Sequence, residues 1–508
     1  MSTAISTSRR TRSATRLIVF VVGAASLGAE IAASRLLAPY FGQSTVIWAN
    51  TIATILLALS VGYAVGGRLA DRGADLRGLS RLVLGAAVLL ALVPFLAQPF
   101  LGFAAHALGT LSVGGFLGSL VAVLVLVAVP VLLLGAVAPY AARLNVERVD
   151  ETGRTIGNLY AISTVGSLVG TFLAALLLIP AVGTQATFLS FALALGVVAA
   201  AGMRRWWAWI APGAVAGALL LPTPAVGAVP PGARLLVSVQ TRYQAARVEQ
   251  FPDGTRWLQL NEGQAIHSLY RPHSYLTGGY WDDFLVLPFA AGATRPPGRI
   301  AILGDAAGTV ARAYGHFFPR TRVDAVELDG ELTALGRRWF GLRGPRLHIY
   351  TADARPWLAA TRARYDSIFL DAYRQPYIPF YLVTREFFGI VRAHLRPGGT
   401  FIVNVGHIPG SDALERVVTA TVRSRFRFVL RDHLGADNTL LVASQRPLRA
   451  ADLTASGVRA PEALEGLRVA VARRLGPPLS GGEVFTDDRA PVEWLTDLSI
   501  LRYAAGDR

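Results

Sequence analysis

The first half of the chain is dominated by apolar runs, each about as long as a lipid bilayer is thick. An α-helix needs about 20 apolar residues to cross the hydrocarbon core of a membrane. Runs of this kind predict transmembrane helices near 17–38, 46–67, 81–101, 113–140, 156–180, 185–203 and 206–228. Residues 1–229 are therefore expected to form a multi-pass helical domain of about seven spans, in contact with membrane lipid.

Arginine clusters predict how these helices are oriented. Clusters lie before the first run, between the second and third, between the fourth and fifth, and between the sixth and seventh. Short loops rich in basic residues stay in the cytoplasm, so the N-terminus is expected there. Seven full crossings would place the rest of the chain outside. A last run that lies at the interface or re-enters, as Pro212 and Gly213 suggest, would keep it inside. We favour a protein of the cell membrane with a cytoplasmic second half.

The residue types that are missing exclude several chemistries. The chain has no cysteine, which excludes disulfides and thiolate metal sites, and all 49 basic residues are arginine, which excludes Schiff-base lysines. The net charge of +16 raises the question of nucleic acid. Because the arginines cluster mainly at the ends of membrane runs, we expect no nucleic-acid partner. The histidines are dispersed, so no metal is expected.

The second half has the pattern of an α/β protein. The segments "RLLVSVQT", "QAARVEQF" and "RWLQLNEG" predict a small antiparallel β unit, assigned to 230–295. From Arg299 onwards, strands such as "RIAIL", "RVDAVEL", "RLHIY", "YDSIFLD" and "GTFIVNV" alternate with helical stretches. That alternation predicts a doubly wound, Rossmann-like sheet of the methyltransferase type over 296–450, followed by a C-terminal extension, 451–508.

Acidic residues stand at the ends of four successive predicted strands. In a doubly wound sheet the ligand binds at the carboxyl ends of the strands. The acidic residues at these ends are Asp305, Glu327, Asp329, Asp353 and Asp371. Turn acids placed at random would not follow the strands so regularly, and we expect these carboxylates to line a ligand site.

The first turn indicates what that ligand is. It reads Gly304-Asp305-Ala306-Ala307-Gly308 and does not match the dinucleotide fingerprint. Asp305 would repel a pyrophosphate at the helix N-terminus. A cationic adenosyl sulfonium fits better, with Glu327 accepting the ribose hydroxyls and Asp353 contacting the adenine amino group. Asp371 would then take the proton of an attacking amine.

These residues resemble the spermidine synthase family, the polyamine aminopropyltransferases. The resemblance covers roughly residues 233–445, and the whole chain resembles the membrane-fused, multi-pass bacterial members. "RWLQLNEGQAIHS" is similar to the family's strand, glycine turn and glutamine, with His267 in the glutamine position. "YWD", Tyr280 to Asp282, is similar to the Tyr-His-Glu signature. "LGDAAG", "VELD" and "ADA" are similar to its glycine turn, ribose-binding acid and adenine contact.

The resemblance implies an activity and a set of residues. Asp371 is the implied general base. The residues implied to bind the nucleoside are His267, Tyr280, Asp282, Gly304, Asp305, Glu327, Asp353 and Ala354. The implied reaction moves an aminopropyl group from decarboxylated S-adenosylmethionine to an amine such as putrescine and leaves methylthioadenosine. A homodimer is a further expectation.

Two departures leave alternatives open. Arg374 stands where the family has a second aspartate, and His267 replaces a glutamine, so the acceptor amine is not fixed. One alternative is a methyltransferase that uses ordinary S-adenosylmethionine. Another is a degenerate module that binds polyamines beside a transporting or sensing membrane half. The segment "FTDDRAPVEWL" near the C-terminus is shared with the membrane-fused members, and it fits either a structural cap or part of a site.

Overall fold

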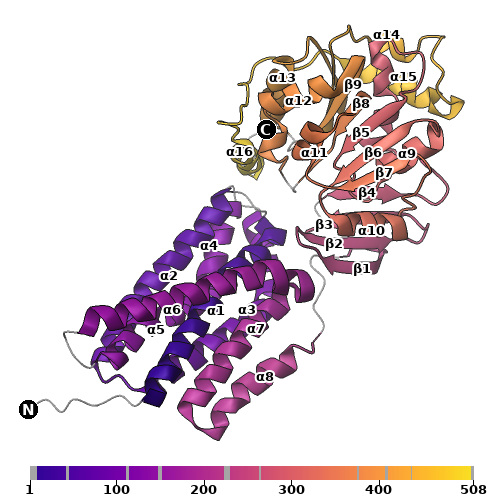
Figure 1. Ribbon diagram of the computed structural model, residues 1–508. Coiled ribbons are helices and arrows are strands. Elements are labelled where there is room, and N and C mark those ends of the chain that lie inside the picture. Colours follow the sequence, from indigo (N-terminus) through magenta and orange to yellow (C-terminus); the bar gives the residue numbers. More distant parts are fainter. Residues whose placement is uncertain are drawn as a thin grey trace, which may run out of the picture. The chain divides into compact units, whose positions relative to one another are not determined.

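The computed structural model describes residues 9–41, 45–109, 114–146, 151–221, 229–261, 265–373, 377–406, 410–435 and 438–504. The chain divides into two compact units, residues 1–227 and 228–508. The described elements of the first unit are helices, and the second is an α/β unit (Figure 1).

The first unit is built from long apolar helices. Its elements are α1 (Arg9–Phe41), α2 (Thr45–Asp71), α3 (Leu76–Gly109), α4 (Gly114–Leu126), α5 (Ala128–Asn145), α6 (Thr152–Phe172), the π-helix η2 (Leu173–Leu178), α7 (Ile179–Met203), the 3-10 helix η3 (Trp206–Trp209) and α8 (Ile210–Ala218). Among the described residues, five helical segments are long and apolar enough to cross a membrane: Arg10–Ala38, Ile47–Asp71, Leu76–Ala97, Ala128–Asn145 and Thr152–Met203.

Two of the expected spans take a different form from simple continuous helices. The run 113–140 is divided into α4 and α5, and the division lies just before Pro130, which has no backbone N–H to continue the helical ladder. The helical stretch 152–203 is interrupted at Gly183, whose φ is 81°, between the expected spans 156–180 and 185–203. In the described part of the run 206–228, the α-helix α8 has nine residues, a length of roughly 14 Å against a hydrocarbon core of about 30 Å.

Glycines allow two helix pairs to approach very closely. A Cβ on Gly166 of α6 would lie 2.2 Å from the carbonyl oxygen of Phe20 in α1, and one on Gly170 would lie 2.0 Å from that of Ala24. Small residues spaced by four are the usual means of such close packing in membranes. The residue numbers of the contacting pairs increase together along both helices, so α1 and α6 run in the same direction.

The same arrangement joins α2 to α5. A Cβ on Gly62 would lie 2.3 Å from the carbonyl oxygen of Leu132, and one on Gly66 would lie 2.2 Å from that of Ala136. Helix α1 also packs on α7, and α5 also packs on α3. Helix α1 thus contacts α6 and α7, and α5 contacts α2 and α3. When α1, α2 and α3 are matched with α5, α6 and α7, these contacts correspond, which is the pattern of an inverted repeat.

The two ends of this helical unit can be told apart from its contacts. A Cβ on Gly202, at the end of α7, would lie 2.2 Å from Ser80 Oγ and 3.7 Å from Ile18 Cδ1, near the starts of α3 and α1. The hydroxyl of Tyr140, near the end of α5, accepts a hydrogen bond from the backbone N–H of Asp75, just before α3. The ends of α5 and α7 and the starts of α1 and α3 therefore lie at one end of the bundle.

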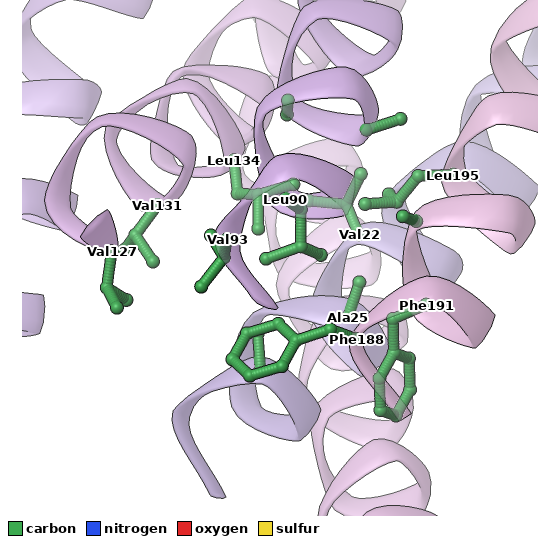
Figure 2. Close-up of a cluster of buried hydrophobic side chains, with 14 of the residues drawn as sticks. Val22, Ala25, Leu90, Val93, Val127, Val131, Leu134, Phe188, Phe191 and Leu195 are labelled. Atoms are coloured by element: carbon green, nitrogen blue, oxygen red, sulfur yellow. The ribbon is translucent and has the colours of Figure 1, made fainter. Parts of the chain in front are cut away.

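An apolar core holds the bundle together. Figure 2 shows side chains from α1, α3, α5 and α7 that meet in its interior. The labelled members are Val22, Ala25, Leu90, Val93, Val127, Val131, Leu134, Phe188, Phe191 and Leu195.

The second unit begins with a four-stranded antiparallel sheet. Its strands are β1 (Arg234–Gln240), β2 (Ala245–Gln250), β3 (Arg256–Leu260) and β4 (Ile266–Tyr270), paired in chain order. The expected antiparallel unit is confirmed, and β4 is an additional strand. The 3-10 helices η4 (Tyr280–Leu285) and η5 (Leu287–Ala291) connect it to the larger sheet.

The larger sheet has eight strands in the order β12-β10-β11-β9-β8-β5-β6-β7. Its strands are β5 (Arg299–Leu303), β6 (Arg322–Glu327), β7 (Leu347–Thr351), β8 (Tyr365–Leu370), β9 (Leu395–Gly406), β10 (Phe428–Leu434), β11 (Asn438–Ser444) and β12 (Leu475–Gly476). The strands β5 to β9 are parallel, whereas β10, β11 and β12 add antiparallel pairs at one side. This confirms the expected doubly wound, Rossmann-like fold.

Helices connect and cover the parallel strands. They are α9 (Thr309–Phe317), α10 (Gly330–Trp339), α11 (Ala354–Ala360), η6 (Phe380–Leu382), α12 (Arg385–His394) and α13 (Ala413–Arg423). The C-terminal region adds α14 (Ala450–Leu453), η7 (Glu462–Leu464), α15 (Glu465–Arg474) and α16 (Val492–Ala504). Its β12 joins the large sheet, and Phe485 and Val492 are fully buried in the core beside α12 and α13.

Candidate active site

The site lies where the strand order reverses between β5 and β8. In doubly wound sheets this is the point where the loops separate and leave room for a ligand. The backbone N–H of Gly304 donates to the carbonyl of Val326, and that of Asp371 donates to the carbonyl of Leu303, both at 2.9 Å. These bonds keep the ends of β6, β5 and β8 level, so the acids that follow them come together.

The glycine turn after β5 is shaped by close backbone contact. Gly304 has a φ of 89°, and a Cβ there would lie only 2.5 Å from the carbonyl oxygen of Asp371. No other residue type fits both the backbone angle and the space. The residue thus allows the turn to pass directly beside the backbone of Asp371.

Asp305 carries a buried carboxyl group at the glycine turn. Its side chain is 6% exposed, and among the described residues neither carboxylate oxygen has a hydrogen-bond partner. Burial raises the pKa of Asp305 well above its usual range, and the nearby charges of Glu327 and Asp371 raise it further. A buried anion without a partner is costly, and a cationic ligand would relieve that cost.

Glu327, at the end of β6, is held beside the glycine turn. Its Oε2 accepts the backbone N–H of Ala306 at 2.8 Å, and its Oε1 accepts that of Asp329 at 2.9 Å. Burial raises the pKa of Glu327, while these two N–H groups oppose the shift. Each oxygen keeps a further lone pair, so the carboxylate can also accept the two hydroxyls of a ribose.

Asp371, at the end of β8, has two hydrogen-bond donors. Asn404 Nδ2, from β9, donates to its Oδ1 at 2.9 Å, and the Tyr280 hydroxyl donates to its Oδ2 at 3.1 Å. Burial raises the pKa of Asp371 to about 6, against the lowering effect of these two bonds. The carboxylate keeps partial solvent access. A base with this pKa is largely ionised at neutral pH and can still hold a proton.

Aromatic hydroxyls surround this base. Tyr280 begins η4, and η4 is fixed by the hydroxyl of Tyr314, which donates to the carbonyl of Phe284 at 2.9 Å. Tyr373 follows Asp371, donates to the carbonyl of Asn404 at 3.1 Å and accepts the backbone N–H of Gly406. Burial raises the pKa values of Tyr280 and Tyr373, so both stay protonated.

Asp353 lies at the start of α11, after β7. Its Oδ1 caps the helix by accepting the backbone N–H of Arg355 at 3.0 Å, and its Oδ2 accepts the hydroxyl of Tyr381 at 2.8 Å. Ala354, the first residue of α11, is buried. This pair occupies the β7 side of the cluster, away from Asp371.

One of the residues that sequence reasoning assigned to the ligand, Asp282, holds a turn. The carboxylate of Asp282 accepts both the backbone N–H and the hydroxyl of Thr277 and the N–H of Gly278, and so holds the turn before η4. His267 lies on β4. Its neighbour Ser268 accepts the N–H of Ala307 at 2.9 Å, which places β4 against the glycine turn.

Sequence reasoning missed Asn404, Tyr373 and Tyr381. Asn404 was recognisable as the one strongly polar residue in the apolar stretch "GTFIVNV", but its partner Asp371 was not. Arg374, the departure that leaves the acceptor open, lies outside the described residues. Across the described part of the chain there is no cluster of three or more potential metal ligands.

Comparisons with known proteins point to one family. No family model matches the chain. It is 30% identical over 274 residues to the probable polyamine aminopropyl transferase of Bifidobacterium longum, covering 50% of this chain and 60% of that protein. It is 27% identical over 345 residues to the polyamine aminopropyltransferase of Mycobacterium tuberculosis, covering 63% and 62%. It is 27% identical over 434 residues to polyamine aminopropyltransferase 1 of Streptomyces coelicolor, covering 77% and 75%.

A solved structure is similar as well. A probable spermidine synthase from Corynebacterium glutamicum is 22% identical, with a TM-score of 0.38, and the match covers 53% of this chain and 100% of that one. The match to the Bifidobacterium protein spans less than two thirds of its length. By sequence, this chain is similar to proteins named as polyamine aminopropyltransferases.

Proposed function

We propose that the protein is a membrane-anchored aminopropyltransferase. Its co-substrate is decarboxylated S-adenosylmethionine, its acceptor is an amine, and its nucleoside product is methylthioadenosine. The named relatives support this class of reaction. The observation that carries the proposal is the buried carboxyl group of Asp305, whose oxygens have no hydrogen-bond partner in the described part of the chain and whose pKa the charges of Glu327 and Asp371 raise.

The charge of the site supports a sulfonium ligand. Three acids gather at one sheet edge: burial raises the pKa values of Asp305, Glu327 and Asp371, and the charges of Glu327 and Asp371 raise that of Asp305 further. A positively charged sulfur and a protonated amine would offset that repulsion. A free carboxylate on the co-substrate would add to it, and this favours the decarboxylated form over ordinary S-adenosylmethionine.

Asp371 acts as the general base of the reaction. It removes a proton from the ammonium of the acceptor and frees the nitrogen lone pair. The nitrogen forms a bond to the propyl carbon, the carbon–sulfur bond breaks, and the sulfur keeps the electron pair as a neutral thioether. Tyr280 and Asn404 hold the carboxylate in place through their hydrogen bonds.

The helices support a topology with six crossings. Helices α1, α2 and α3 give three crossings, and the repeated triplet α5, α6 and α7 gives three more, because α4 continues into α5 and adds no crossing of its own. The arginine clusters then fall at the single end that holds the starts of α1 and α3 and the ends of α5 and α7. By the positive-inside rule that end is cytoplasmic, and the second unit follows α7 on the same side. The nucleoside co-substrate is available there.

The experiment is a product assay. Purified protein is incubated with decarboxylated S-adenosylmethionine and a panel of mono- and diamines, and the nucleoside products are separated by chromatography. We expect methylthioadenosine that accumulates only with an acceptor amine and is lost in Asp371→Asn. Release of S-adenosylhomocysteine from ordinary S-adenosylmethionine would instead establish methyl transfer. Binding or liposomal flux of polyamines without turnover would favour a transport or binding role.

A further inference from the structure

The segment before α16 is fixed against the site side of the large sheet. Phe485 is fully buried, its backbone N–H donates to Thr421 Oγ1 at 3.0 Å, and its carbonyl accepts the N–H of Arg385 at 2.8 Å. Val492 is buried in the same core. The residues between these two anchors, including Asp487 and Asp488, therefore run along the start of α12.

Asp487 uses this position to join α11 to α12. Its Oδ1 and Oδ2 accept Nη1 and Nη2 of Arg355 at 2.8 and 2.6 Å, a bidentate ion pair. Its Oδ1 also accepts the hydroxyl of Thr384 at 2.7 Å, and its backbone N–H donates to Glu386 at 3.0 Å. Thr384 is fully buried and caps α12 by accepting the N–H of Phe387.

Arg355 carries the connection onward into the site. Its Nη1 donates to the carbonyl of Tyr381 at 2.9 Å, and the Tyr381 hydroxyl in turn donates to Asp353 at 2.8 Å. Asp353 also accepts the backbone N–H of Arg355. A closed network thus runs from Asp487 through Arg355 and Tyr381 to the acid expected beside the adenine.

We infer that Asp487 is a positioning residue, which locks the far end of the loop between β8 and α12 and orients Asp353 for the nucleoside. The loop begins at Asp371, the proposed base, and ends at Thr384, which Asp487 holds directly. Hydrogen bonds therefore hold the two described end residues, Asp371 and Thr384. This inference rests on the proposed function, because the nucleoside is the ligand that Asp353 would contact.

Bidentate charge-assisted pairs have a defined geometry and are stronger than neutral hydrogen bonds. The Asp487 side chain is 44% exposed, so the ion pair is expected to contribute little to the overall free energy of unfolding. Its main effect is expected on the position of the loop. Losing this pair should make Arg355 less fixed, and so weaken its hold on Tyr381 and Asp353. Chemistry at Asp371 should be less affected, since Asp371 takes its hydrogen bonds from Tyr280 and Asn404.

The test compares Asp487→Asn with a matched control, Asp488→Asn. Asp488 is the next residue, is exposed, and makes no hydrogen bond or ion pair among the described residues. Amide hydrogen exchange is measured over 377–386, and methylthioadenosine affinity is measured by calorimetry on the full-length protein. For Asp487→Asn we expect faster exchange there and roughly tenfold weaker affinity, the scale of about 1.4 kcal/mol. KM for the nucleoside should rise by a similar factor, with a smaller change in kcat and no shift in the acid limb of its pH profile.

A double-mutant cycle with Arg355→Gln tests whether the effect of Asp487→Asn comes from the loss of the Asp487–Arg355 ion pair or from a general loss of stability. Because Arg355 also donates to the carbonyl of Tyr381, the double variant should lose no more affinity than Arg355→Gln alone if the pair is the source of the effect. Equal exchange and affinity in Asp487→Asn, Asp488→Asn and wild type would overturn the inference. Wild-type protein that binds no methylthioadenosine would overturn the proposed function, and the exchange comparison would still decide whether Asp487 holds the loop.

Discussion

The hydroxyl of Tyr280 lies 3.1 Å from Oδ2 of Asp371, although the two residues are 91 positions apart. Tyr280 comes from the 3-10 helix before the large sheet, and Asp371 comes from the end of β8. Burial raises the pKa of Asp371, and this bond and the one from Asn404 oppose that shift and favour the ionised form. The Tyr280–Asp371 pair therefore influences the protonation of the proposed base.

The pH profile should report this relationship. Because the pKa of Asp371 is raised to about 6, kcat/KM of the wild type should fall as the pH drops through about 6. Tyr280→Phe removes a bond that lowers this pKa, so the acid limb should move to higher pH and kcat should fall by about tenfold. Tyr243→Phe, at an exposed position on the β1–β2 turn, is the control and should leave the profile unchanged. An acid limb that stays in place in Tyr280→Phe would contradict the assignment.

Asp305→Asn should stabilise the empty protein and weaken its ligand. The pKa of Asp305 is raised in the fold, so the folded state binds more protons than the unfolded state. Stability is then lost as the pH rises above the unfolded value of about 4, by up to about 1.4 kcal/mol per pH unit. Between pH 5 and pH 8 the melting temperature should therefore fall more in the wild type than in Asp305→Asn. The variant should also bind the cationic co-substrate more weakly. If the melting temperature of the variant has the same pH dependence as that of the wild type, ionisation of Asp305 does not destabilise the folded protein and the prediction is wrong.

Gly304→Ala should displace the backbone at the base. A Cβ would lie 2.5 Å from the carbonyl oxygen of Asp371 on a backbone with a φ of 89°. We expect a loss of at least about 1–2 kcal/mol in unfolding free energy, from the positive φ alone, together with most of the activity. Gly315→Ala in α9 is the control, because a Cβ there meets no atom within 4 Å. Chemical denaturation and turnover measure both effects. An active Gly304→Ala variant of normal stability would be the contrary result.

The absence of native cysteine makes the topology simple to measure. Single cysteines are introduced at Ser44, between α1 and α2, and at Asp253, in an exposed turn of the small sheet. A membrane-impermeant maleimide on intact cells should label Ser44→Cys, and should label Asp253→Cys only after permeabilisation. Labelling of Asp253→Cys in intact cells would place the second unit outside and contradict the six-crossing topology.

Much of the fold was predictable because it depends on local patterns. Apolar runs of bilayer length and the alternation of strands with helices are visible in the sequence, and the strand-end acids follow from the parallel sheet. The Asp305, Glu327 and Asp371 cluster was predicted on that ground, and the structure brings these residues together.

The rest depends on contacts between distant residues. The bond from Asn404 to Asp371 requires knowledge of which strand lies beside β8, and the Asp487–Arg355 pair joins positions 132 apart. Asp282 was assigned to the ligand from a short motif, but its hydrogen bonds to Thr277 and Gly278 belong to a turn. Motif position alone does not distinguish these uses of a carboxylate.

The central claim is that buried carboxylates select a positively charged sulfur nucleoside. Its most direct test is calorimetric titration of wild-type protein, without acceptor amine, with decarboxylated S-adenosylmethionine and with the neutral thioether methylthioadenosine. The two ligands share the methylthioadenosine part, and the co-substrate adds the positive charge on sulfur and an aminopropyl group with a protonated amine. We predict that the sulfonium binds at least about tenfold more tightly and that this preference shrinks in Asp305→Asn. Equal affinities for the two ligands, unchanged in the variant, would contradict the account.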